Sequence, residues 1–152
     1  MDNIHELVYG LRDKDNDYAY QCLKQLQAES SNSDKVYSYF DYFTEMLDDS
    51  NSYIRARGIH MIAANAQWDK ECKLYGIIDK FLEHILDEKP ITARQCIQLL
   101  PMIAEHKPNL KEKIVSALLK AEPKKYKETM QKLIFKDIEK SLELIANKWS
   151  GK

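Results

Sequence analysis

The sequence predicts an all-α protein built from stacked helical hairpins. Three observations support this prediction. Apolar residues recur at spacings of three and four along most of the chain, polar turn segments separate them at even intervals, and the 152 residues include only four glycines and four prolines. With 44% hydrophobic and 31% charged residues, the composition suits a helix-rich domain and disfavours a disordered chain. No segment alternates convincingly with a period of two, so we predict no strands.

Five apolar stripes mark the expected helices, because each stripe is what an amphipathic helix shows when one face packs on a core. The stripes are formed by Ile4, Leu7, Val8 and Leu11; by Val36, Tyr39, Phe40, Phe43, Met46 and Leu47; by Leu74, Ile77, Ile78, Phe81, Leu82 and Ile85; by Leu110, Ile114, Ala117 and Leu118; and by Ile138, Leu142, Ile145 and Trp149.

Seven polar segments separate the expected helices, and their Asp, Asn and Ser residues can accept hydrogen bonds from the free N–H groups that open a helix. Pro90, Pro108 and Pro123 suit a first helical turn, where a missing N–H costs nothing. Short loops between helices favour antiparallel neighbours, hence hairpins. The seven segments are 13–17, 29–34, 48–52, 67–71, 87–90, 106–109 and 121–125.

The chain also repeats itself. Segment 47–64 aligns without gaps with segment 11–28 at an offset of 36 residues, and with segment 85–102 at an offset of 38. Cys22, Gly58 and Cys96 then share one position. A weaker fourth copy follows at an offset of 33, which places Pro123 on Pro90. A period of 33 to 38 residues with two helices per unit is typical of an α-solenoid.

Segment 35–66 carries the clearest repeat pattern: two acids at Asp48 and Asp49, a polar turn, then Ile54, Arg55 and the small residue Gly58. In this pattern the chain resembles the HEAT/armadillo superfamily, in which an acid ends the first helix of a repeat and an aliphatic–Arg pair begins the second. The resemblance implies a right-handed α-α superhelix, a HEAT-like solenoid of about four hairpins. Within a single domain, 1–152, we expect repeats at about 2–30, 34–67, 70–106 and 108–135, and a C-terminal helix at 137–149.

Several residues are expected to be structural. Arg55 should pair with Asp48 or Asp49 and brace the turn between the two helices of its repeat, since a guanidinium suits a carboxylate. Ala19 and Ala93 stand at the Arg55 position in two other copies, so an Asp–Arg ladder along the repeats would be incomplete. Gly58, Cys22 and Cys96 should lie where two helices approach closely, with each cysteine acting as a small hydrophobe. Trp149 is expected to cover the end of the last repeat.

The candidate binding residues come from the surface lined by the second helix of each repeat, where solenoids usually bind. Two outward columns are expected there, one of Gln21, Arg57, Gln95 and Glu128, the other of Lys24, His60, Gln98 and Gln131. Arg57 and His60 are the two residues of segment 47–64 to which the repeat pattern assigns no structural role. The alternative is a solvent-exposed helix face without a binding role, which would contain much the same polar residues. Tyr37 and Tyr42 fall off their core stripe and are candidate contact residues, since tyrosine is favoured at interfaces; alternatively they pack between repeats.

The predicted function is non-enzymatic: a protein-binding module or adaptor that recognises a protein or peptide segment on its inner face. We predict no catalytic residues, no metal ligands and no cofactor, because the sequence has no catalytic motif and no Cys/His spacing for zinc. A HEAT-like DNA-binding protein, or one of the alkylpurine DNA glycosylase type, is the alternative. Nucleic acid is disfavoured because residues 1–106 have a net charge of −7, while residues 107–152 have +6. Because the two parts of the chain have opposite net charges, which attract between copies, self-association is a further hypothesis.

The expected location is the cytoplasm. The three cysteines are an odd number without redox or metal spacing, and the first residues lack the positive start and apolar stretch of a signal peptide. No apolar run is long enough to cross a membrane, so we expect no membrane partner.

Overall fold

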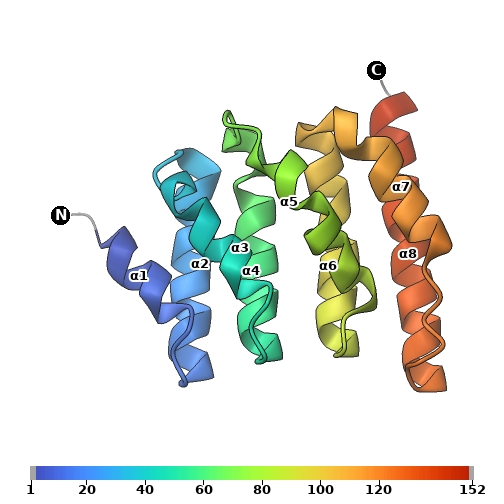
Figure 1. The fold of residues 1–152 in the computed structure, drawn as a ribbon, viewed down its shortest axis with the longest axis horizontal. Coiled ribbons are helices and arrows are strands. Elements are labelled where there is room, and N and C mark those ends of the chain that lie inside the picture. The colour runs from blue at the N-terminus through green and yellow to red at the C-terminus, as the bar shows by residue number, and fades with distance from the viewer. Residues whose placement is uncertain (1–2, 151–152) are drawn as a thin grey trace. The chain divides into compact units, whose positions relative to one another are not determined.

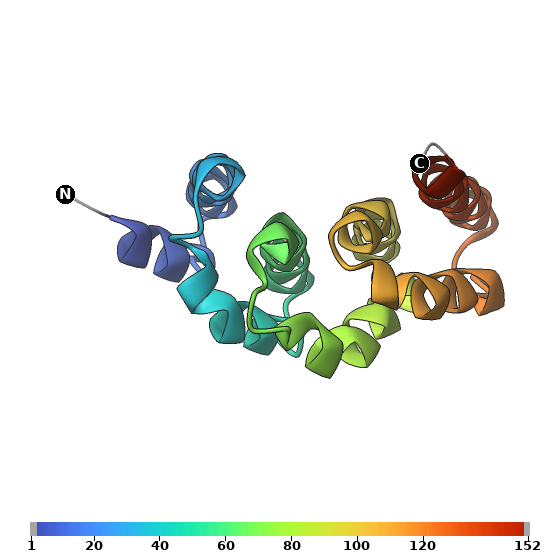
Figure 2. The ribbon, with the colours of Figure 1, turned by 90° about the horizontal axis from the view of Figure 1, so that it is seen from above.

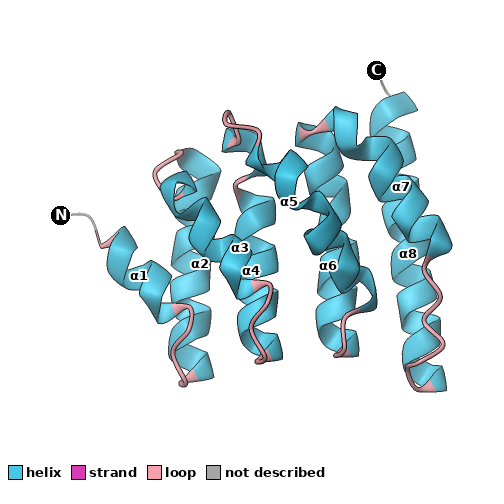
Figure 3. Ribbon diagram, in the orientation of Figure 1, coloured by secondary structure: helices cyan, strands magenta, loops and turns pink. Residues whose placement is uncertain are grey.

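The computed structural model describes the backbone of residues 3–150 and the side chains of residues 3–147. The predicted role of the Trp149 side chain lies outside the described residues. The predicted all-α class is confirmed: every regular element in the described part is a helix, and none is a strand (Figure 3). The chain groups into two compact units, Met1–Glu71 (unit 1) and Cys72–Lys152 (unit 2). Each unit is described by itself below, and the single domain stays a prediction.

Unit 1 consists of two helical hairpins. Helix α1 packs on α2, α3 packs on α4, and the two hairpins stack through α2 and α4. Within this unit, α1 and α3 form one layer and α2 and α4 the other (Figure 2). The elements are α1 (Ile4–Gly10), α2 (Asn16–Asn32), the 3₁₀ helix η1 (Tyr37–Tyr39), α3 (Phe40–Met46), α4 (Ser52–Ala64) and the 3₁₀ helix η2 (Ala66–Trp68).

Unit 2 repeats this plan. Helix α6 packs on the 3₁₀ helix η3, which follows α5, while α7 packs on α8, and the two hairpins stack through α6 and α8 (Figure 1). The elements are α5 (Lys73–Leu82), η3 (Glu83–Leu86), α6 (Pro90–His106), the 3₁₀ helix η4 (Pro108–Leu110), α7 (Lys111–Lys120) and α8 (Glu128–Ser150). The right-handed superhelix and the HEAT resemblance remain predictions.

The helix boundaries follow the local chemistry of the turns. The Asp15 carboxylate accepts hydrogen bonds from the N–H groups of Asp17 and Tyr18 and so caps α2, and the Asn51 side chain caps α4 in the same way. Pro90 is the first residue of α6, and Pro108 is the first of η4. Pro123 is different: it is buried in the loop before α8, so the prediction that it sits in a first helical turn is wrong.

The predicted separate helix at 137–149 is also wrong, because α8 runs without a break from Glu128 to Ser150. The buried residues Ile134, Ile138 and Ile145 lie on one side of this helix, and no glycine or proline interrupts them. The second helix of the expected fourth repeat and the C-terminal helix are therefore one element.

Helix α6 contains a proline, Pro101, in its interior. Pro101 has no N–H, so the carbonyl oxygen of Ile97, four residues earlier, loses its helical partner. The buried hydroxyl of Ser141 on α8 donates to this oxygen at 2.5 Å. A side chain of the neighbouring helix thus replaces the bond that the proline removes.

Candidate functional site

The turn between α3 and α4 contains the residues predicted to brace a repeat. The buried guanidinium of Arg55 donates to the carbonyl oxygens of Asp49 and Ser50, at 3.0 and 3.1 Å. The Asp49 carboxylate accepts from Arg12, at 3.0 Å. Asp48 lies exposed at the start of the turn. Arg55 therefore holds the turn through backbone oxygens, and Asp49 links it to the first hairpin.

The three positions predicted for close packing are all buried. A Cβ placed on Gly58 would lie 2.8 Å from the Met46 Cβ and 3.0 Å from the Phe43 carbonyl oxygen, so α3 and α4 touch there. The Cys22 sulfur packs against α1 in the same manner, 2.5 Å from the position of a Cβ on Gly10. Burial raises the pKa of the Cys96 thiol, which leaves this sulfur protonated and suited to packing.

Arg57 does not point outward as expected, and that prediction is wrong. Its side chain is 6% exposed, and its guanidinium donates to the Leu11 carbonyl oxygen and to the Asn16 side-chain oxygen, both at 2.8 Å. The reason is geometric: this side of α4 faces the turn between α1 and α2. Burial lowers the pKa of Arg57. The residue joins the two hairpins of unit 1.

Of the two alternatives for Tyr37, the structure supports packing inside the fold over an exposed contact residue. It is 9% exposed, and its hydroxyl donates to the buried Asp69 carboxylate. Burial, together with this hydrogen bond, raises the pKa of Tyr37. The tyrosine ties η1 to the segment that follows η2.

Tyr42 is half-buried and belongs to a row of side chains in contact, which come from α1, the turn after it and α3. Its ring centre lies 5.7 Å from that of Tyr9 and 5.1 Å from the Arg12 guanidinium carbon. His5 extends the row, with its ring centre 4.4 Å from that of Tyr9. These contacts connect α1 to α3, so much of the Tyr42 ring serves packing.

Three predicted binding residues of unit 1 share one face of α2 and α4. Gln21 and Lys24 are exposed and His60 is half-buried. His60 Nδ1 lies 3.5 Å from Gln27 Nε2, which joins the two helices on this side.

Two tyrosines that are not among the predicted binding residues complete this face. Tyr20, 56% exposed, precedes Lys24 by one helical turn, and the lysine nitrogen lies 5.6 Å from its ring centre. Tyr53, 60% exposed, precedes His60 by two turns and shares its side of α4. We call Tyr20, Gln21, Lys24, Tyr53 and His60 the α2/α4 face.

The predicted columns of unit 2 include residues that hold its hairpins together. Gln98 is exposed and donates to the Asp137 carboxylate at 3.3 Å, and Gln95 is half-buried. Arg94 pairs with the same carboxylate at 2.6 Å, and this hydrogen bond raises the pKa of Arg94. Further along, the Gln131 side chain donates to the Tyr126 carbonyl oxygen at 2.8 Å, while Glu128 lies exposed at the start of α8.

A buried polar cluster lies where η3 leads into α6. The Asp87 carboxylate accepts a hydrogen bond from the Lys89 N–H at 2.9 Å and lies 2.7 Å from His84 Nδ1. The Tyr126 hydroxyl donates to the Asp87 carbonyl oxygen. Burial, followed by the nearby Asp87 charge, raises the pKa of Tyr126 to about 12. Since His84, Asp87 and Tyr126 are all buried, the cluster joins loops and offers no open surface.

Within the described residues, no group of three or more His, Cys, Asp or Glu side chains could hold a metal ion. In the same part of the chain, every helix is too short or too polar to span a membrane. Comparisons with protein-family models, with curated proteins and with solved structures find no match to this chain.

Proposed function

We propose that this chain is a non-enzymatic protein-binding module of HEAT-like helical hairpins, and that the α2/α4 face of unit 1 contacts the partner. The observation that carries the proposal is the pair of tyrosines, Tyr20 and Tyr53, each more than half exposed on the second helix of its hairpin. Tyrosine is enriched among the residues that dominate binding energy, because its ring is large and rigid and its hydroxyl can hydrogen-bond.

The surroundings of the two rings suit a peptide segment. Lys24 and Gln21 stand beside Tyr20 and can donate to the carbonyl groups of an extended or helical segment. Two contacts hold side chains of the face in place: Lys24 lies over the Tyr20 ring, and His60 lies beside Gln27 of α2. Side chains already ordered before binding lose less entropy when the partner arrives.

The test is an affinity capture from the organism's own extract, followed by titration of the captured protein against purified variants. The double variant Tyr20→Ala, Tyr53→Ala should weaken binding by about a hundredfold, since a well-placed interface tyrosine contributes about 1–2 kcal/mol. Tyr75→Ala on α5 is the matched control, because Tyr75 is also an exposed tyrosine of a helix. It should bind as the unaltered protein does.

Two results would overturn the proposal. One is a partner that binds the double variant as tightly as the unaltered chain. The other is the recovery of no protein partner together with reproducible turnover of a small molecule by the purified chain.

A further inference from the structure

Helix α7 of unit 2 has two apolar sides. Ile114 and Leu118 are buried in the unit, as expected for an amphipathic helix. Val115 and Leu119 lie on a different side, and Leu119, at 68% exposure, is the most exposed large hydrophobic side chain among the described residues. A single exposed leucine is ordinary, whereas a second apolar stripe on one short helix is a candidate contact surface.

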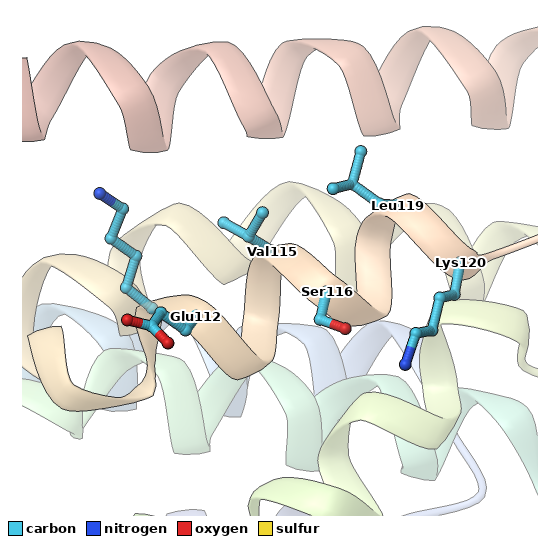
Figure 4. Close-up of a pocket in the computed structure, with 6 residues that line it drawn as sticks. Glu112, Val115, Ser116, Leu119 and Lys120 are labelled. Carbon is cyan, nitrogen blue, oxygen red and sulfur yellow. The ribbon is translucent and has the colours of Figure 1, made fainter.

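The second stripe lines a shallow depression of about 370 Å³. In the close-up, Val115 and Leu119 point to the same side of α7, and Ser116 and Lys120 leave it on the other (Figure 4). We call this surface the α7 face; its lining residues are Lys111, Glu112, Val115, Ser116, Leu119 and Lys120.

The charges around the α7 face are mainly positive. Two lysines and one acid line the depression. Residues 111–147 as a whole contain nine lysines and six acids, and unit 2 has a net charge of +5. The pairs Asp137–Arg94, Glu122–Lys124 and Glu143–Lys140 each combine one acid with one base, so they leave this excess of positive charge unchanged. An approaching partner therefore meets a net positive field.

We infer that the α7 face binds an acidic amphipathic helix of a partner protein. The leucines of such a helix would pack on Val115 and Leu119, and its carboxylates would face Lys111 and Lys120. Helix α7 is ten residues long, or about 15 Å, which suits a contact of about three helical turns. This inference does not depend on the proposed function, because it concerns different residues in the other unit.

The experiment uses the whole chain and two synthetic peptides of about sixteen residues, long enough for about four helical turns. Both have leucines on one helical side; the first has glutamates on its flanks, and the second has lysines instead. Fluorescence anisotropy should show binding of the acidic peptide, and binding of the basic peptide that is at least about tenfold weaker. Leu119→Glu should weaken binding of the acidic peptide by about tenfold or more.

Two further variants control this result. Ile91→Glu introduces the same charge at another exposed apolar residue, 56% exposed on α6, and should leave binding unchanged. Lys120→Glu should weaken the acidic peptide and strengthen the basic one, because it reverses one charge of the α7 face. Leu119 and Lys120 are exposed, so circular dichroism should show the fold unaltered in both variants.

The inference is overturned if the acidic peptide does not bind, if the basic peptide binds equally well, or if Leu119→Glu has no more effect than Ile91→Glu. It is also overturned if the α7 face serves another occupant. Sedimentation that shows a dimer broken by Leu119→Glu would assign the face to a second copy. Binding to phosphatidylserine vesicles that is lost in Leu119→Glu, without peptide binding, would assign it to a membrane surface.

Discussion

The two units share one plan but join their hairpins with different chemistry. In unit 1 arginines make two of the links: Arg12 pairs with Asp49, and Arg57 donates to the Leu11 carbonyl oxygen and Asn16. The side chains of Gln67 and Trp68 also donate to the Ser30 carbonyl oxygen. In unit 2 two hydroxyl groups donate across the hairpins, Tyr126 to the Asp87 carbonyl oxygen and Ser141 to the Ile97 carbonyl oxygen. Two ion pairs also join them, Arg94 with Asp137 and Lys113 with Asp79.

The two units share the stacking of their second helices but not the residues that link their hairpins. In both units the second helices stack, and side chains from one hairpin satisfy backbone oxygens of the other. The residues that do so differ because any donor of suitable reach can satisfy a buried carbonyl. The surfaces differ as well: by sequence, unit 1 has a net charge of −6 and unit 2 of +5. A shared fold therefore supports two chemically distinct surfaces.

The largest effect is expected from removing the buried arginine of unit 1. Arg57→Met should lower the free energy of unfolding by about 3 kcal/mol, because it removes two charged hydrogen bonds and leaves the Leu11 carbonyl oxygen without its donor. The measurement is urea unfolding, with amide hydrogen exchange to assign the loss to unit 1.

Arg94→Met provides the comparison in unit 2. The Arg94 side chain is more exposed than that of Arg57, and its pair with Asp137 can be replaced by water, so the expected loss is about 1 kcal/mol or less. Equal losses for the two variants would show that the buried arginine is no more important to unit 1 than the ion pair is to unit 2.

Two glycines should respond in opposite directions to the same substitution. Gly58→Ala places a methyl group 2.8 Å from the Met46 Cβ and should destabilise unit 1 by about 2 kcal/mol through overpacking. Gly76→Ala on α5 meets no atom within 4 Å, and should stabilise the protein by about 0.5–1 kcal/mol, because alanine loses less backbone entropy in a helix. Thermal unfolding of both variants measures the difference, and a loss of stability for Gly76→Ala would contradict the open space seen there.

The sequence predicts the helices of both units better than the links between them. All seven polar segments overlap a break between helices, and Cys22, Gly58 and Cys96 are buried as the repeat alignment predicts. These features are local, since they depend on periodicity, caps and the size of one side chain. The continuous α8 was missed because the boundary came from a weak repeat copy, whereas nothing in 128–150 stops a helix.

The outward prediction for Arg57 was wrong, and the packing of Tyr37 was left as one of two alternatives, for a different physical reason. Periodicity says which side of a helix a residue occupies, but not which neighbour lies on that side. Arg57 finds a backbone oxygen 46 positions away, and no sequence pattern reports such a bond. Tyr20 and Tyr53 could have been found, because they stand one and two helical turns before the predicted residues Lys24 and His60.

The single bond between Ser141 and the Ile97 carbonyl oxygen should have a smaller effect on stability than Arg57 or Gly58. Ser141→Ala should lower the free energy of unfolding by about 1 kcal/mol, because it leaves a buried carbonyl without a donor. Pro101→Ala restores an N–H that can bond to this oxygen within α6, so Ser141→Ala should cost almost nothing when it is made in the Pro101→Ala background. A double-mutant cycle by urea unfolding measures this coupling. If Ser141→Ala costs the same whether or not Pro101 has been replaced, the hydroxyl stabilises α8 by packing alone, and the Ser141 bond does not compensate for the proline.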